Sequence, residues 1–395
     1  MLRRTDPSPR ARHVLELARK HKKSASAAMG EFSSEEQAAL ICEAPLARRA
    51  ELLDLSPVPQ EVIPELPEAE LVFVVKAVGP SDAAWILEYA SPEQYVACID
   101  LDAWNGTLPD LASLEEWIDA FAEIGSEGLL RALRSLDAEI VVMFLRSRLS
   151  VAQRPPSDDQ DWEPPEGGQT LDGQFYFTAL DSKDDLASTV VLLRSLFENE
   201  YWAYFRMMQG VAWELAADNE EWALRWRTGR LQDLGFPPWD EAMGIYRYLR
   251  PEERGEIPIG ARPLAVGKWH LPVWVPALPK ASDASESIFT AIAQLDPEER
   301  QSCFYSLVAL SNKIAVADGM ELSDATSTPR ALEKAARYAS AGLEFIAGDH
   351  RLEAAQVLRS VTLERLFTVG ANFDPEHARP GAASESPGAI RGEGL

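Results

Sequence analysis

Residues 66–104 read LPEAELVFVVKAVGPSDAAWILEYASPEQYVACIDLDAW and contain three starts in which a proline is followed by an acid. The starts are Pro67-Glu68, Pro80-Ser81-Asp82 and Pro92-Glu93. Proline suits the first helical position because its missing N–H would be unpaired there, and an acid in the first turn meets the positive end of the helix dipole. Each start precedes an apolar stripe, which short helices bury only by stacking on neighbours. The segment predicts a stack of short helices, which is typical of a scaffold.

The composition of the rest of the chain predicts how it is divided into modules, a linker and flexible ends. Basic residues outnumber acids near the N-terminus, which predicts a basic flexible arm over 1–33. A helical-repeat module is expected over 34–150, followed by a Pro-rich acidic linker over 151–170. A second, aromatic-rich helical module is expected over 171–372, and the polar tail 373–395 is expected to be disordered. The predicted fold class is mainly all-α, a superhelical stack of short helices followed by a second helical module, with few or no strands.

Local signals predict individual elements. Ser33 or Ser34 followed by acids resembles a capping box, and Asp296-Pro297 repeats the proline–acid start. Apolar spacing predicts further helices, and a run of strand-forming residues predicts one strand or hairpin arm. The predicted helices cover 46–55, 114–124, 129–149, 181–213, a helix from about 220, 328–348 and 352–369, and the predicted strand covers 173–180.

Charge and cysteine content exclude several classes of protein. The 395 residues carry a net charge of −25, so generic nucleic-acid binding is not expected, because affinity for phosphate backbones comes mainly from Lys and Arg. Cys42, Cys98 and Cys303 lie too far apart for a disulfide framework or a zinc site. No apolar run reaches the ~18 residues needed to span a bilayer, and no apolar signal region follows Arg3-Arg4. A cytoplasmic protein without a membrane span is expected.

The common motifs of catalysis and cofactor binding are missing from the sequence. It contains no GxSxG, GxxxxGK[ST], GxGxxG after a strand, or HExxH, and no cofactor is expected. Of the five histidines only His270, beside Trp269, is a candidate functional residue, although a buried histidine bonded to a carbonyl is the favoured interpretation. The proline-rich segment 255–280 also holds Trp274, and it is either buried extended chain or an exposed apolar strap for a partner.

The acids between 82 and 119 suggest a weak divalent-cation site. Asp100 and Asp102 lie near the end of the repeat stretch, and further acids follow soon after. A solvated acidic helix face is the favoured alternative, because magnesium requires an octahedral set of oxygen ligands that spacing alone does not establish.

A second candidate region combines tryptophans with arginines. Five of the eleven tryptophans lie between positions 202 and 239, ending with Trp239. A large aromatic core is the simple interpretation and a ligand pocket is the alternative. Arg225, Arg227 and Arg230 form a basic cluster that is a candidate site for a phosphate or a carboxylate-bearing partner. Ion pairing to the acids of 233–241 is the favoured alternative.

The same region contains a predicted helix end. Gly229 or Gly235 can end a helix in a left-handed cap, and Phe236 can then pack back on that helix. Pro237-Pro238 predicts a rigid turn before the next helix.

Two stretches resemble known families. The proline–glutamate helices of 56–104 resemble the superhelical N-domain of MgtE-type magnesium transporters and the middle segments of the flagellar switch protein FliG. Residues 222–246, WALRWRTGRLQDLGFPPWDEAMGIY, resemble the core of a large bacterial family of unknown function found mainly in delta-proteobacteria. This second resemblance covers about 35–370 and implies a helical protein of the MgtE-N type with no assigned activity. Members of that family continue past Gly370, which makes the polar tail after Asn372 a divergence.

The leading hypothesis is a cytoplasmic helical scaffold or regulatory protein that binds another protein, with no catalytic activity indicated. Two alternatives stay open. One is a regulator that senses a divalent cation such as Mg²⁺. The other is an enzyme with a pocket in the aromatic-rich module, where Arg225 or Arg230 anchors an anion.

Overall fold

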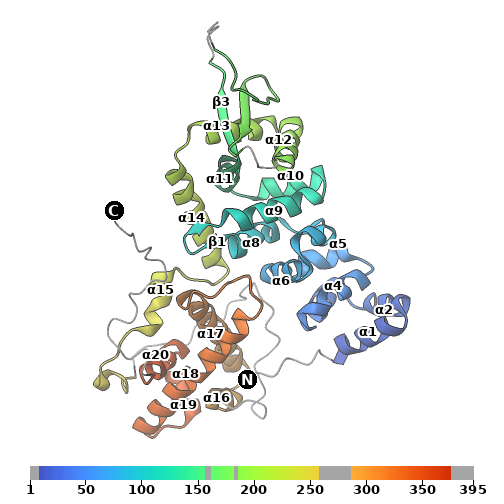
Figure 1. The fold of residues 1–395 in the computed structure, drawn as a ribbon. Coiled ribbons are helices and arrows are strands. Elements are labelled where there is room, and N and C mark those ends of the chain that lie inside the picture. Colours follow the sequence, from blue (N-terminus) through green and yellow to red (C-terminus); the bar gives the residue numbers. More distant parts are fainter. Residues whose placement is uncertain (1–8, 156–161, 182–185, 258–285, 375–395) are drawn as a thin grey trace.

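The computed structural model describes residues 9–155, 162–181, 186–257 and 286–374. Within these ranges the chain forms twenty α-helices and two small antiparallel sheets, which confirms the predicted all-α class. Helices α1 to α13 follow one another along an elongated stack that ends at strands β3 and β4 (Figure 1). Helix α14 then runs back along this stack toward the group formed by α15 to α20.

The first helices include those of the segment 66–104. They are α1 (Pro9–Lys20), α2 (Lys22–Met29), α3 (Ser34–Cys42), α4 (Leu46–Leu55), α5 (Pro59–Val62), η1 (Ile63–Glu65), α6 (Glu68–Val78), η2 (Pro80–Ala83), α7 (Ala84–Leu87) and α8 (Pro92–Asp102). Helix α3 begins with the predicted capping box at Ser33, and α8 begins with a second one at Ser91. The start at Pro80 differs from prediction. It opens the 3₁₀ turn η2 and then one short helix, α7, in place of a single longer helix.

Residues 9–29, which the sequence assigned to a basic flexible arm, form α1 and α2. Ala11, Val14, Ala25 and Met29 are at most 1% exposed, because α1 and α2 pack on each other and on α3 and α4. The basic side chains occupy the opposite, solvated face of α1, as in an amphipathic helix. A basic segment with an apolar stripe therefore becomes the first layer of the stack.

The middle helices contain two breaks that the sequence analysis missed. They are α9 (Leu111–Glu123), α10 (Ser126–Ser135), α11 (Ala138–Arg148), α12 (Ala187–Asn199), α13 (Tyr201–Trp213) and α14 (Ala216–Asp233). Single helices predicted over 129–149 and 181–213 were wrong, since non-helical backbone at Leu136-Asp137 and at Glu200 divides them. The first break has a packing reason. Helix α10 packs mainly on α8, α9 and α12, whereas α11 packs mainly on α13 and α14 and less on α9.

Two hairpins complete this part of the chain. Strands β1 (Trp104–Asn105) and β2 (Leu108–Pro109) pair across a turn at Gly106, whose φ is 63°. Strands β3 (Leu149–Gln153) and β4 (Phe175–Ala179) pair antiparallel, with Leu149 opposite Ala179, which confirms a strand within the predicted range 173–180.

The remaining helices surround a second core. They are α15 (Trp239–Met243), η3 (Gly244–Tyr246), η4 (Pro251–Glu253), α16 (Ser287–Ala293), α17 (Pro297–Ala317), α18 (Ser327–His350), α19 (Ala354–Ser360) and α20 (Leu363–Ala371). Helix α17 begins at the predicted proline–acid start, with Asp296 in a capping box. The last helix predicted, over 352–369, is divided into α19 and α20.

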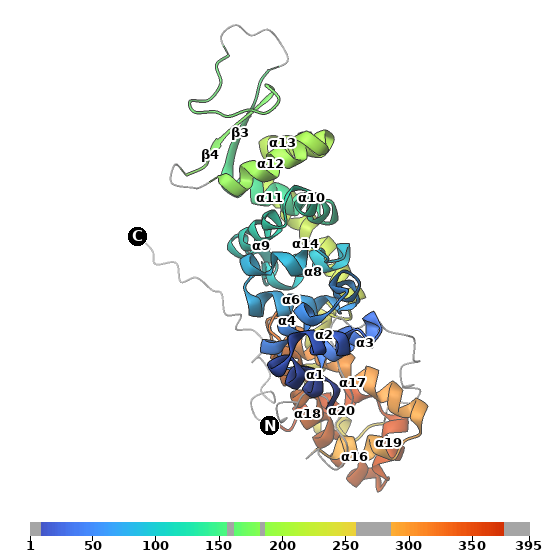
Figure 2. The same ribbon diagram turned by 90° about the vertical axis from the view of Figure 1, so that its right-hand side faces the viewer.

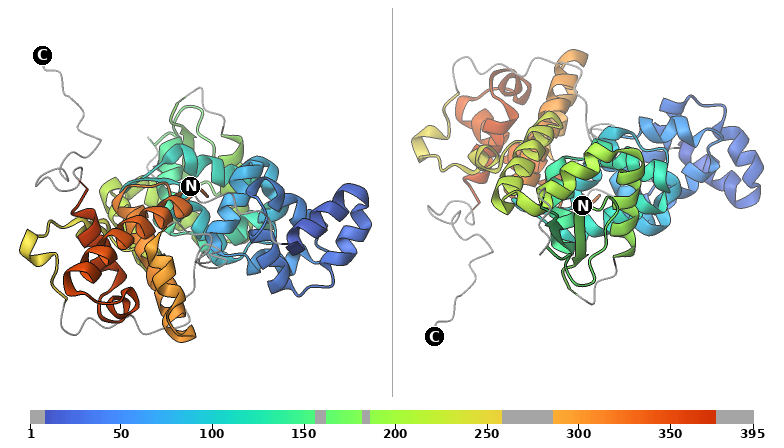
Figure 3. Two further views of the ribbon diagram at one scale, coloured as in Figure 1. Left: turned by 90° about the horizontal axis from the view of Figure 1, so that it is seen from below. Right: turned by 90° about the horizontal axis from the view of Figure 1, so that it is seen from above.

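Two hydrophobic clusters divide the described chain. The first runs from Ala11 to Phe236 and the second from Ile245 to Ala371. Residues 171–236, which the sequence assigned to the second module, therefore contribute to the first core, since β4 pairs with β3 and α12 to α14 pack on α9 to α11. From the side, the first core is a column of helices with the second core at its base (Figure 2). Helices α1 to α4 and the second core lie on opposite sides of the molecule (Figure 3).

Candidate functional site

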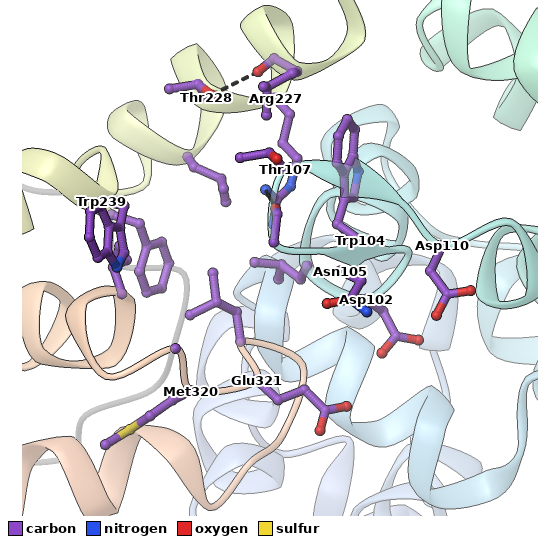
Figure 4. Close-up of a pocket in the computed structure, with 18 of the residues that line it drawn as sticks. Asp102, Trp104, Asn105, Thr107, Asp110, Arg227, Thr228, Trp239, Met320 and Glu321 are labelled. Carbon is purple, nitrogen blue, oxygen red and sulfur yellow. Dashed lines mark hydrogen bonds between the residues drawn. The ribbon is translucent and has the colours of Figure 1, made fainter. Parts of the chain in front are cut away.

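A cleft of about 980 Å³ lies where the first core, α14 and the connection between α17 and α18 meet. Its wall on the first core comes from α8 and the β1–β2 hairpin, including Asp102 and Trp104. Arg227 of α14 and Glu321 of the α17–α18 connection close two further sides. Trp239 and Asp110 lie at opposite ends of this cleft (Figure 4).

The end of α14 positions the apolar side of the cleft. Gly235 adopts φ 84° and donates its N–H to Gln232 O at 2.9 Å, while the N–H of Phe236 reaches back to Leu231 O at 2.7 Å. These two bonds define a Schellman cap, which confirms the predicted left-handed cap at Gly235. Phe236 packs into the first core at 6% exposure, and the chain then turns at the two prolines so that Trp239 begins α15 at 56% exposure.

Lys76 ties the two cores together beside the cleft. Its ammonium group pairs with Asp102, with Glu321 at 3.1 Å and with Ser323 Oγ at 3.0 Å. Asp102 also accepts a hydrogen bond of 2.9 Å from Trp117 Nε1. Burial alone would lower the pKa of Lys76, but its bonds to the two carboxylates raise it. Lys76 is therefore a charged link between α6, α8 and the α17–α18 connection.

Arg227 reaches from α14 to the β1–β2 hairpin. Its guanidinium lies 4.8 Å from the ring centroid of Trp104 and donates to Asp100 O at 2.8 Å and to Gly106 O at 3.3 Å. Burial lowers the pKa of Arg227 to about 10. The indole Nε1 of Trp104 is buried without a hydrogen-bond partner among the described residues. Arg227 thus holds the hairpin against α14 through backbone and ring contacts.

Arg230 is a structural ion pair. It donates to Asp100 at 2.6 and 2.9 Å and to Asp137 at 3.0 and 2.7 Å. Burial alone would lower the pKa of Arg230, but hydrogen bonds to the two carboxylates raise it. Ion pairing, the favoured interpretation of the sequence, is what the structure shows, but the partners come from α8 and the start of α11 and not from the acids of 233–241.

The other predicted site residues lie elsewhere. Arg225 lies on another face of α14, with its guanidinium 5.2 Å from the Trp222 ring centroid. Trp222 and Trp226 stack on each other at 6.0 Å and are about half exposed. Trp269, His270 and Trp274, the residues of the predicted strap, lie outside the described residues. Of the predicted residues that the structure describes, the cleft therefore brings together Arg227 and Trp239 alone.

The cleft is acidic. Five carboxylates and two cations line it. Lys76 engages Asp102 and Glu321, whereas Asp110, Glu116 and Asp240 have no cation within 4.0 Å in the described part of the chain. The Asp110 carboxylate caps α9 by accepting from the N–H groups of Ala112 and Ser113. The cleft therefore presents an excess of negative charge beside an apolar surface.

Acids near 82–119 do not gather into a metal site. Asp100 and Asp102, named in the cation hypothesis, are engaged by Arg230 and Lys76. In the described ranges no group of three or more His, Cys, Asp or Glu side chains is placed to hold a metal ion.

A model of a family of unknown function, DUF6178, matches residues 26–373. The chain belongs to the DUF6178 family. The match spans the cleft, the second core and the first core from the end of α2 onward, so the cleft lies within the part of the chain that defines the family. No curated protein and no solved structure matches the chain. No helix in the described residues is both long enough and apolar enough to cross a bilayer.

The sequence analysis missed most of the residues that build the cleft. Asn105-Gly106 was recognisable as a turn, but nothing in the sequence showed that the turn faces α14. Lys76, Trp104 and Glu321 carry no local motif. Lys76 meets Glu321 across 245 residues of sequence, and Arg227, which lies over Trp104, reaches 121 residues back to Gly106.

Proposed function

We propose that this protein is a helical scaffold that binds a segment of a partner protein in the cleft between the two cores. The observation that carries the proposal is the combination of the half-exposed indole of Trp239 with carboxylates that lack a cation partner, in one open cleft. The resemblance of 56–104 to the MgtE N-domain, and a cytoplasmic location, belong to the same proposal.

The chemistry of the cleft favours a peptide that carries both an apolar side chain and Lys or Arg. Charge complementarity steers association and selects the partner. Aromatic side chains that become buried are common anchors of protein interfaces. An indole that is 56% exposed leaves on the order of 100 Å² to cover, which at ~25 cal/mol per Å² is about 2–3 kcal/mol. That amount corresponds to roughly a hundredfold in Kd.

The open shape of the cleft, and not its volume, supports a peptide over a small metabolite. Small-molecule pockets are ~300–1,000 Å³ and enclose most of their ligand, whereas this cleft of about 980 Å³ is open along one side. Among the described residues, the cleft lining includes the hydroxyl groups of Thr107, Ser113 and Thr228 but no cysteine or histidine. The binding role rests on the open shape of the cleft and the exposed indole, since carboxylates are also groups that acid–base chemistry uses.

Selection of peptides from a random displayed library tests the proposal. We expect wild-type protein to enrich sequences that combine Lys or Arg with a large apolar residue. Trp239→Ala should lower the affinity of those peptides about 30- to 100-fold, whereas Trp226→Ala, which removes an exposed tryptophan outside the cleft, should leave it unchanged. Enrichment of acidic or uncharged peptides, or equal losses in the two variants, would contradict the proposal.

The cation hypothesis is tested separately by titrating Mg²⁺ or Ca²⁺ while following thermal unfolding. A cation at 100 times its Kd adds about 2.7 kcal/mol of stability. An unchanged melting temperature in millimolar cation would exclude such a site.

A further inference from the structure

A second cavity, of about 720 Å³, lies in the second core between residues 247–257 and α20. Two arginines line it, Arg247 just after η3 and Arg365 in the first turn of α20. Arg365 is only 9% exposed, whereas Arg247 is exposed. The cavity thus has one buried and one accessible guanidinium.

The buried guanidinium is incompletely paired. Arg365 Nη2 donates to Glu253 O, but its Nε is buried without a hydrogen-bond partner within the described ranges. Burial, and then the positive charge of Arg247, lower the pKa of Arg365. A buried charge without compensation is costly, and it is usually paired. The position of Arg365 in the first turn of α20 increases the cost of burying its charge, since the first turn of a helix favours anions and disfavours cations.

Neighbouring acids do not neutralise this pair directly. Glu253 and Glu256 line the cavity, but neither lies within 4.0 Å of a nitrogen of Arg247 or Arg365 in the described structure. The Glu253 carboxylate is engaged at 2.8 Å by the backbone N–H of Arg250, where it caps η4. The two acids make the local electrostatic potential less positive, but their carboxylates are too far from the guanidinium groups to accept hydrogen bonds from them.

We propose that Arg247 and Arg365 bind the carboxylate of a small organic acid. A planar carboxylate matches the fork of a guanidinium group and accepts two parallel hydrogen bonds. The charges of Glu253 and Glu256 offset those of the two arginines, so the second negative charge of a phosphate monoester gains no net attraction, and the planar fit of a monocarboxylate makes it the favoured ligand. Tyr248, which is 50% exposed, and Ile257 give the cavity an apolar side for the rest of the ligand. This site is separate from the cleft and does not depend on its function.

Titration of the full chain with benzoate at constant ionic strength, followed by calorimetry, tests the proposal. We expect saturable binding of benzoate, at least about tenfold weaker binding of phenyl phosphate, and none of benzamide, which has the same shape without the charge. Arg247→Gln, an exposed substitution, should weaken benzoate binding at least about tenfold, and Arg365→Lys should also weaken it, because lysine keeps the charge but loses the fork.

Arg250→Gln is the matched control, because it removes a charge from the same segment outside the cavity lining. This variant should bind benzoate as the wild type does. The proposal is overturned by an absence of saturable benzoate binding, by equal binding of benzamide, by tighter binding of phenyl phosphate, or by equal affinity in Arg247→Gln and Arg250→Gln.

Discussion

Replacement of Arg230 by methionine tests whether the ion pairs of Arg230 with Asp100 and Asp137 hold three helices of the first core together. Arg230 of α14 holds Asp100 of α8 and Asp137 at the start of α11 through four hydrogen bonds of 2.6 to 3.0 Å. The Asp100 side chain is only 4% exposed and that of Asp137 is 17% exposed. Methionine keeps most of the apolar stem of arginine but leaves both carboxylates without their cation.

The expected loss in the free energy of unfolding is about 3 kcal/mol at pH 7. Removing one partner of a buried ion pair costs ~3–5 kcal/mol, because the other charge stays buried and uncompensated. The Arg230 side chain is itself 32% exposed, so water screens part of the interaction and the lower end of that range applies. Arg225→Met is the matched control on the same helix. It removes only the contact with Trp222, which is worth about 0.5–1 kcal/mol.

The loss should also depend on pH. Burial raises the pKa of Asp100, and removal of Arg230 should raise it further. An acid whose pKa is higher in the folded state binds protons more readily there than in the unfolded chain, so it lowers stability as pH rises. The deficit of Arg230→Met should therefore shrink between pH 7 and about pH 5. Urea unfolding followed by far-UV circular dichroism measures both effects. A loss no larger than that of Arg225→Met, or one that does not change with pH, would refute the reasoning.

Three further predictions concern packing, capping and thiol reactivity. Gly370→Ala should cost at least about 3 kcal/mol in urea unfolding, because the new Cβ would lie 1.9 Å from a backbone oxygen of α18. Gly348→Ala meets nothing within 4 Å and should stabilise α18 by about 0.5–1 kcal/mol, so similar losses in both variants would contradict the packing argument. Ser91→Ala removes the cap of α8 and should cost about 1 kcal/mol, and no change would show that the cap is dispensable. Burial raises the pKa of all three thiols, that of Cys303 to about 11, so a disulfide reagent at pH 8 should react at least about tenfold faster after unfolding. Fast reaction of the reagent with the native protein would contradict the burial of these thiols.

Local chemistry was the part of the fold that the sequence predicted well. The capping box at Ser33, the proline–acid start at Asp296-Pro297 and the left-handed cap at Gly235 each depend on a few adjacent residues. The strand within 173–180 was predicted for the same reason, since its strand-forming side chains are consecutive. Such features are stabilised by neighbours in sequence, so the sequence contains most of the information that specifies them.

The breaks in the longer helices could not be predicted in this way. Neither Leu136-Asp137 nor Glu200 contains the proline or glycine that usually interrupts a helix. The break before α11 is specified by tertiary packing, because Asp137 there meets Arg230, which is 93 residues away in sequence. Apolar periodicity continues across such a break, and a periodicity argument therefore joins two helices into one.

The arginine cluster shows why adjacency in sequence misplaced the candidate site. At 3.6 residues per turn, Arg227 and Arg230 lie on one side of α14, and Arg225 lies on another. The first two meet Asp100 at its backbone oxygen and carboxylate, so that side of the helix is a structural contact with little capacity left for a ligand. The group that retains that capacity is the exposed indole of Trp239 beyond the cap at Gly235. Among the described residues, only Arg230 of the three arginines forms an ion pair, and a search for ligands is better directed to side chains that the fold leaves exposed and without a partner.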